Sequence, residues 1–270
     1  MLTISNEDFN RLVTFIKGSY GIDLSKKRQL ITGRLSNTIM AKGFASFTEY
    51  VDYILKNKDP KEIDVLINKL TTNYTYFMRE SAHFDFFKET ILPWLEKVKK
   101  NRVLSIWSAG CSSGEEPYTI SMILKDYFGA KTPKWDTRVL ATDISQNVLS
   151  TAQNASYELS ALNDLPAGWL QKYFRKDKDG LYKVSQEIKD NVIFRTFNLM
   201  DPIKFRLKFD VIFCRNVMIY FDQPTKDALV NRFYNATVPD GYLMIGHSES
   251  LNKETTPYRY LKPATYQKIV

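Results

Sequence analysis

From about residue 101 onward, short apolar runs alternate with helical segments, and this alternation constrains the fold more than any other feature of the chain. Runs of this length are typical of buried strands. The alternation favours an α/β fold with a mostly parallel sheet and helices on both faces. We expect strands at Arg102–Trp107, Arg138–Thr142, Val192–Phe197, Phe209–Phe213 and Gly241–Ile245, helices at Glu115–Phe128, Ile144–Gln153 and Gln223–Ala236, and a hairpin of Tyr258–Leu261 with Thr265–Val270.

The first 70 residues are helical in pattern and almost free of strand signals. Ser46, followed three residues later by Glu49, is a capping-box pattern for a helix start. Asp59-Pro60 predicts another helix, with proline at its first position. The polar segment at about 155–190 does not fit the strand–helix alternation and has a turn at Lys178-Asp179-Gly180. We therefore expect an N-terminal all-α domain and a small inserted β-subdomain.

Composition excludes some classes of protein and leaves others open. The formal charge of +8 fits a nucleic-acid partner, or equally any acidic partner. Two histidines, and two distant cysteines, Cys111 and Cys214, make a metal site unexpected. No apolar run approaches the ~20 residues that span a bilayer, and no signal peptide is evident. We expect a cytoplasmic monomer without membrane insertion.

Ligands of open parallel sheets bind beyond the carboxyl ends of the strands, so the residues at those ends are the candidates for ligand contacts. After the first strand comes Ser108-Ala-Gly-Cys-Ser-Ser-Gly114, whose small side chains let backbone approach a ligand closely. The loop lacks both the dinucleotide fingerprint and the lysine of a P-loop. Glu115 and Glu116 open the next helix, where they would repel a diphosphate and favour a sulfonium or amino group. They could instead be acids favoured by the helix dipole.

The other strand ends carry polar side chains. Asp143 could accept hydrogen bonds from both ribose hydroxyls of a nucleoside, or it could be the N-cap of a helix beginning at Ile144. Asn198 follows the next strand, and Arg215 and Asn216 follow the fourth, where they would face the reacting end of a ligand.

At these positions the chain resembles the bacterial chemotaxis receptor glutamate O-methyltransferases, the CheR family. The resemblance implies a class I S-adenosylmethionine-dependent methyltransferase, with a Rossmann-like, mostly parallel seven-stranded sheet. It implies a helical receptor-docking domain at 1–70, a linker at 71–100 that closes over the cofactor, and a methyltransferase domain at 101–270 with the insertion. The motifs are Thr71-Thr-Asn-Tyr-Thr-Tyr-Phe-Met-Arg-Glu80, Ser108-Ala-Gly-Cys-Ser-Ser-Gly-Glu-Glu-Pro-Tyr118, Ala141-Thr-Asp-Ile144, Phe213-Cys-Arg-Asn-Val-Met-Ile-Tyr-Phe-Asp222 and Gly246-His-Ser-Glu-Ser-Leu251.

The resemblance also assigns roles to single residues. Arg79 and Tyr220 are the expected catalytic residues, with Tyr220 near the transferred methyl group. The expected cofactor-binding residues are Asn73, Thr75 and Arg79 of the linker, Gly110 and Glu116 at the first loop, Asp143 at the ribose, Asn198 and Leu199 at the adenine, and Arg215 and Asn216 at the methionine end.

The implied reaction transfers the methyl group of S-adenosylmethionine to receptor glutamates, giving methyl esters and S-adenosylhomocysteine. A glutamate with a pKa near 4.3 is already ionised at pH 7, so no general base or metal is needed. We expect the Arg79 guanidinium to hold the acceptor carboxylate and Tyr220 to donate a hydrogen bond there. Alternatively, Arg79 could pair with Glu80 or a cofactor carboxylate, and Tyr220 could only pack under the next helix.

Two competing functions remain at this point. One is a signalling module that binds S-adenosylmethionine or S-adenosylhomocysteine without turnover. The other is a nucleic-acid methyltransferase. The chain has no Asn/Asp-Pro-Pro-aromatic motif after the fourth strand, which argues against this second function. Neither His83, expected in a first helical turn, nor His247 is expected to contact substrate, and both cysteines are expected to be packing groups.

A basic segment predicts the partner. Between Leu24 and Thr48 there is no acid, and Lys27 and Arg34 are seven residues apart, so they would share a helix face. We expect docking on the acidic helical bundle of a chemoreceptor through Lys26, Lys27, Arg28 and Arg34, although a solvated basic face is the alternative. The insertion loop at Arg175–Gly180 is short and charged, so no C-terminal receptor peptide is expected to bind there.

Overall fold

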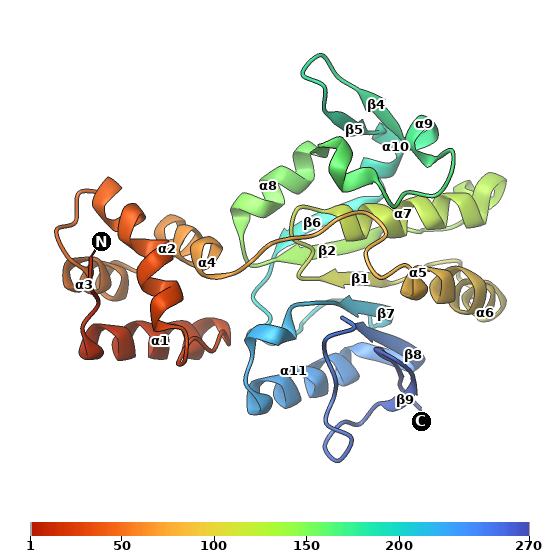
Figure 1. Ribbon diagram of the computed structural model, residues 1–270. Coiled ribbons are helices and arrows are strands. Elements are labelled where there is room, and N and C mark those ends of the chain that lie inside the picture. The colour runs from red at the N-terminus through yellow and green to blue at the C-terminus, as the bar shows by residue number, and fades with distance from the viewer. Residues whose placement is uncertain (1, 270) are drawn as a thin grey trace.

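The computed structural model describes residues 2–269, and its main feature is a seven-stranded sheet in the order β6-β2-β1-β7-β8-β10-β9 (Figure 1). The first five strands in this order are parallel, and β10 runs antiparallel to both of its neighbours. The expected α/β fold and its C-terminal hairpin are confirmed, while Met1 and Val270 lie outside the described residues. The strands are β1 Ile106–Ala109, β2 Val139–Asp143, β6 Val192–Thr196, β7 Phe209–Cys214, β8 Thr237–Ile245, β9 Arg259–Lys262 and β10 Thr265–Gln267.

Two hydrophobic cores lie on opposite faces of the sheet because successive strand residues alternate in direction. Trp107 and Ile212 face a core that contains α11, whereas Ile106 and Val211 face a second core with α5, α6 and α7. The Trp107 ring is fully buried among phenylalanine rings, including that of Phe233. The helices of this part are α5 Ala82–Phe86, α6 Leu92–Val98, α7 Glu115–Phe128, α8 Gln146–Asn154 and α11 Gln223–Ala236.

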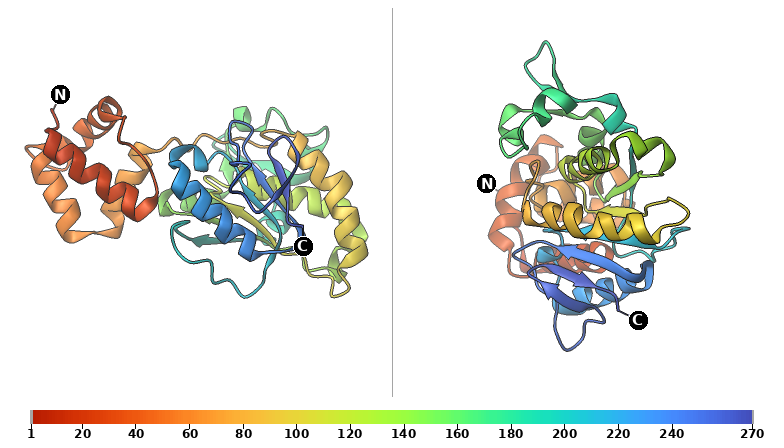
Figure 2. Two further views of the ribbon diagram at one scale, coloured as in Figure 1. Left: turned by 90° about the horizontal axis from the view of Figure 1, so that it is seen from below. Right: turned by 90° about the vertical axis from the view of Figure 1, so that its right-hand side faces the viewer.

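The N-terminal region is a group of four helices that lies off the carboxyl edge of the sheet (Figures 1 and 2). Ser46 and Asp59 cap the third and fourth helices, as the sequence predicts. The buried residues of these helices continue the core that contains α11. The four are α1 Asn6–Tyr20, α2 Arg28–Ala41, α3 Phe47–Asn57 and α4 Pro60–Leu70.

Several contacts join the helical region to the sheet domain. Gly21 ends α1 with a φ of 75°, and a side chain there would meet Met200 Sδ at 2.7 Å, so glycine permits this close approach. Ile22 pairs with Phe221 in an isolated antiparallel bridge. From α4, the Asp64 carboxylate accepts the backbone N–H of Gln146 at 2.8 Å, at the first residue of α8.

The inserted subdomain is a three-stranded antiparallel sheet in the order β3-β5-β4, at the top of Figure 1. Asp126 of α7 accepts hydrogen bonds from Trp169 and Lys172, which fixes the insertion to the main domain. The expected mixture of helix and hairpin is therefore found. Its elements are β3 Ser156–Tyr157, α9 Trp169–Tyr173, β4 Phe174–Lys176, β5 Tyr182–Val184 and α10 Gln186–Lys189.

Several predicted element limits and one predicted cap are wrong. α8 begins at Gln146 rather than Ile144, and β8 begins at Thr237 rather than Gly241. The first strand covers Ile106–Ala109 rather than starting at Arg102, because Ser108 and Ala109 pair with β2 while Val103 makes only an isolated bridge with Asp136. Asp143 is not a helix N-cap. It is the last residue of β2, and Ser145 caps α8 by accepting the Val148 N–H.

Candidate functional site

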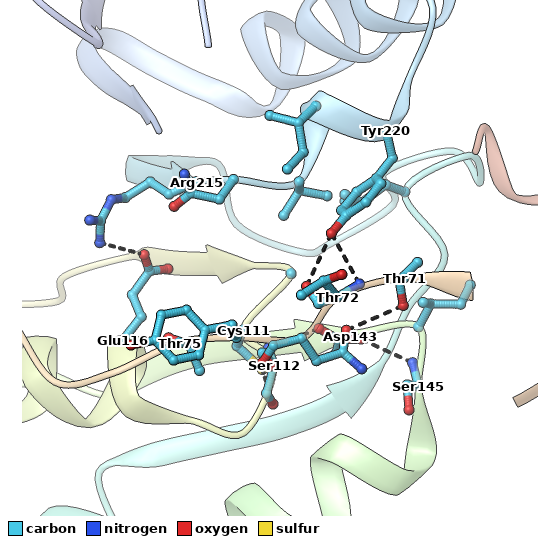
Figure 3. Close-up of a pocket in the computed structure, with 18 of the residues that line it drawn as sticks. Thr71, Thr72, Thr75, Cys111, Ser112, Glu116, Asp143, Ser145, Arg215 and Tyr220 are labelled. Atoms are coloured by element: carbon cyan, nitrogen blue, oxygen red, sulfur yellow. Dashed lines mark hydrogen bonds and ion pairs between the residues drawn. The ribbon is translucent and has the colours of Figure 1, made fainter. Parts of the chain in front are cut away.

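A cavity of about 420 Å³ opens at the carboxyl edge of the parallel strands, between the sheet, the linker and the helical region (Figure 3). This volume is within the range of small-molecule sites. All eleven residues assigned from the sequence line it: Asn73, Thr75, Arg79, Gly110, Glu116, Asp143, Asn198, Leu199, Arg215, Asn216 and Tyr220.

At the floor of the cavity, the Asp143 carboxylate accepts the backbone N–H groups of Ser112 at 2.8 Å and Ser145 at 3.0 Å (Figure 3). Burial raises the pKa of Asp143, and the two backbone donors oppose that rise. A carboxylate has about four acceptor positions, so it can still accept ribose hydroxyls. The two backbone bonds fix its orientation in advance.

The loop after β1 places backbone atoms, unshielded by large side chains, at the cavity. Gly110 has a φ of 85°, and a Cβ there would lie 2.3 Å from Val217 Cγ2, so no larger residue fits. The N–H groups of Gly110 and Cys111 both donate to the Thr142 carbonyl, which ties the loop to β2.

At the other end, the buried Arg215 guanidinium lies between two carboxylates. It pairs with Glu116 at 2.9 Å and with Glu80 at 3.1 Å. Asn216, held at a φ of 59°, donates to the same Glu80 carboxylate at 3.3 Å. Two acids around one guanidinium leave a formal charge of −1, which favours a cationic ligand group. Arg215 Nε is buried and has no hydrogen-bond partner among the described residues.

Glu249, a buried residue with no role predicted from the sequence, shapes the loop after β7. Its carboxylate accepts the backbone N–H groups of Asn216 at 2.9 Å, Ile219 at 3.1 Å and Gly246 at 2.6 Å. Burial raises the pKa of Glu249, and these backbone bonds act against the rise. The presence of an acidic residue shortly after the fifth strand is the sequence feature that could have indicated this role.

The linker crosses the mouth of the cavity as a strap of residues 71–80 (Figures 1 and 3). The Tyr220 hydroxyl donates to the Thr72 carbonyl at 3.0 Å and accepts the Thr72 N–H at 3.1 Å. Ser112 Oγ donates to the Asn73 carbonyl at 2.9 Å. Tyr220 therefore anchors the strap, a role the sequence did not indicate, and its direct role at the acceptor stays a prediction.

Arg79 lies on the strap and lines the cavity. Its Nη1 donates to the Tyr74 carbonyl at 2.7 Å, which leaves its other N–H donors available. The described residues show no Arg79–Glu80 ion pair, and Glu80 pairs with Arg215 instead.

The helical region supplies the far wall, a contribution that the sequence did not indicate. Tyr20, Ile22 and Ile67 line the cavity beside Leu199, and together they offer apolar surface for a flat ring. Asn198 is fixed beside them because its Nδ2 donates to the Ser19 carbonyl at 2.8 Å.

Two of the four residues of the basic segment, Arg28 and Arg34, make internal contacts. Arg28 donates to the Ile4 carbonyl, and Arg34 donates to the carbonyls of Lys69 and Thr71 at the end of α4. Lys27 is the N-cap of α2, one residue before the helix begins. Two of the four cations are therefore engaged in internal contacts.

The strand order, the carboxylate at the end of β2 and the cavity at the carboxyl edge together define a class I S-adenosylmethionine-dependent methyltransferase. The sequence model of the all-alpha domain of CheR methyltransferases matches residues 7–71, and that of their SAM-binding domain matches residues 73–267. The chain belongs to the CheR methyltransferase family. The two matches meet near the end of α4.

Known relatives resemble the chain along nearly its whole length. A chemotaxis protein methyltransferase of Borreliella burgdorferi is 44% identical over 272 residues, covering 99% of this chain and 96% of that protein. The proteins of the same name from Salmonella typhimurium and Escherichia coli are 37% and 36% identical, each over 93% of this chain and over 86% and 87% of their own lengths.

The residues of the cavity fit the cofactor that this family binds. Asp143 suits a ribose, the apolar wall suits an adenine, and the Glu80–Arg215–Glu116 cluster suits the charged methionine end. Within residues 2–269, no helix is long and apolar enough to cross a membrane.

Proposed function

We propose that the enzyme transfers the methyl group of S-adenosylmethionine to glutamate side chains of methyl-accepting chemotaxis receptors. The main support for this proposal is the arrangement of charges at the methionine end of the cavity. A net negative cluster of Glu80, Arg215 and Glu116 suits a sulfonium, while the Arg79 guanidinium, which no acid pairs with among the described salt bridges, suits an incoming carboxylate.

The proposed chemistry is a displacement at carbon. The cofactor supplies a methyl group on a sulfonium, whose sulfur becomes a neutral thioether as a carboxylate oxygen bonds to the methyl carbon. No proton moves in this step, so the residues need only hold the reactants in line. Positioning of this kind is worth about 7–11 kcal/mol when the reacting atoms are held ~3–3.5 Å apart.

Each residue then has a positioning task. Arg79 holds the acceptor carboxylate and Tyr220 keeps the strap closed over the reacting centre, which excludes water. Glu249 fixes the loop that carries Asn216 and Tyr220. Asp143 fixes the nucleoside end, so that the methyl group meets the acceptor.

The direct test is incubation of the protein with labelled S-adenosylmethionine and membranes that contain native receptors. We expect base-labile methyl groups on a receptor band, because methyl esters hydrolyse in mild base. Methyl groups that resist base would point to nitrogen acceptors. Tight cofactor binding without any transfer would favour the non-catalytic signalling module.

We further propose that the enzyme is a cytoplasmic monomer, recruited to receptors by its helical region and without binding nucleic acid. The formal charge of +8 supports attraction to an acidic receptor bundle. Lys26 and Lys27 are exposed at the start of α2 and are the cations best placed for that contact. Light scattering of the purified protein and cosedimentation with receptor membranes test the two parts separately.

A further inference from the structure

The only two histidines of the sequence, far apart along the chain, meet in the fold. His83 lies in the first turn of α5, His247 follows β8, and their ring centroids are 4.8 Å apart. Glu80 completes the group, with its Oε2 3.6 Å from His83 Nδ1. One ligand atom from each residue lies within 4.8 Å of the other two.

His83 is the residue that needs explanation. It is 1% exposed, and neither of its ring nitrogens has a hydrogen-bond partner among the described residues. The 3.6 Å separation from Glu80 is too long for a hydrogen bond. Buried polar atoms without a protein partner are commonly satisfied by a bound water or ion.

We propose that Glu80, His83 and His247 form a site for a borderline divalent transition-metal ion such as Zn²⁺. Two histidines and one glutamate, with a fourth position for water, form an established ligand set for zinc. Metal–ligand bonds of ~2.0–2.2 Å imply ligand atoms about 3.3 Å apart, so side-chain movements of about 1 Å are required. His247 is exposed and provides the route by which an ion reaches the buried ring.

Metal binding at Glu80 would affect the cofactor site, because Glu80 also pairs with the positively charged Arg215. Glu80 already pairs with Arg215 and accepts from Asn216, and both of these residues line the cofactor cavity. An ion on Glu80 competes with them, so it releases the groups that form the methionine end. Metal binding should therefore weaken cofactor binding reversibly. This inference depends on the cofactor site and is independent of the proposed acceptor.

Zinc binding to the chelator-treated full-length protein, measured by calorimetry, tests the proposal. We expect one Zn²⁺ per chain with micromolar or tighter affinity, and no binding of Mg²⁺, which prefers oxygen ligands. His247→Gln should weaken zinc binding at least tenfold. The exposed Glu254→Gln variant, on the loop after β8, is the matched control and should bind normally.

Two further readouts separate the parts of the proposal. With only two histidines in the chain, both imidazole C–H resonances should shift with Zn²⁺ in the NMR spectrum and neither with Mg²⁺. Saturating zinc should weaken S-adenosylhomocysteine binding at least threefold, with recovery after chelation. Unchanged zinc affinity in His247→Gln would overturn the site, and unchanged S-adenosylhomocysteine affinity would overturn its link to Arg215.

Discussion

Asp143 offers the clearest prediction for a single residue, because its carboxylate faces the cavity from the end of β2. Asp143→Ala should weaken S-adenosylhomocysteine binding by ~1.5–3 kcal/mol, the range for hydrogen bonds to a charged group. Calorimetry measures the change, and the exposed Asp201→Ala variant is the control. Equal affinities in the two variants would remove the ribose assignment.

Substitutions of Arg79 and of Tyr220 should differ in their effects on cofactor affinity and on turnover. Arg79→Ala should lower turnover on the order of 10²-fold with little change in cofactor affinity, because its proposed partner is the acceptor. Tyr220→Phe should also weaken cofactor binding, by ~0.5–1.5 kcal/mol, since the strap loses its bond to Thr72. Single-turnover rates and calorimetry on both variants separate these effects. If Arg79→Ala loses cofactor affinity in proportion to its loss of turnover, Arg79 is a cofactor ligand.

The cavity residues at strand ends could be predicted from the sequence because sheet topology fixes where such residues lie. The contributions of Tyr20, Ile22 and Ile67 could not, since they depend on how the helical region packs against the sheet. Glu249 was missed for a similar reason, because its partners are backbone N–H groups that leave no pattern in side chains.

Among the elements, the limits of two helices could be predicted to the residue. α7 and α11 begin and end at the predicted residues, because local signals such as the Asp222 cap specify a helix end. The limits of β1 depend instead on its partner, since Ser108 and Ala109 read as a turn and become strand only by pairing with β2.

The start of α2 carries a prediction about docking. Lys27→Glu should raise the Michaelis constant for receptor without changing cofactor affinity, and added salt should have the same effect on the unaltered protein. Arg34→Glu should weaken cofactor binding as well, because Arg34 holds the start of the strap through Thr71. A receptor Michaelis constant that does not respond to salt or to Lys27→Glu would remove α2 from the docking surface.

The edge strand β4 carries a second prediction for an element. Asp177 closes a tight turn to β5 by accepting the N–H groups of Asp179 and Leu181, and charged Arg175 and Lys176 occupy the free edge. Charged edges discourage strand addition, so a receptor C-terminal pentapeptide should show no micromolar binding in a calorimetric titration. Micromolar binding would mean that even this short turn leaves a usable edge.

At the scale of the whole molecule, the helical region and the sheet domain build the site together. Asp64 of α4 caps α8 across this junction, so Asp64→Ala should cost ~0.5–2 kcal/mol in the free energy of unfolding. It should also weaken S-adenosylhomocysteine binding, because Asp143 and Ser145 lie at the same end of α8. Thermal unfolding and calorimetry measure both, with the exposed Asp164→Ala as control. Normal binding in Asp64→Ala would indicate that the junction does not support the site.

The strap that Tyr220 anchors has a consequence for how the enzyme senses its supply of methyl groups. Under the proposed assignment, Asp143 and Asn198, in the cavity that the strap covers, would hold a part of the cofactor that is the same before and after transfer. The cluster around Arg215 and the strap over the reacting centre would meet the sulfur whose charge changes. Spent cofactor should therefore keep much of the affinity of fresh cofactor for the closed cavity, so the methylation rate should depend on the ratio of the two in the cell as well as on the abundance of fresh cofactor.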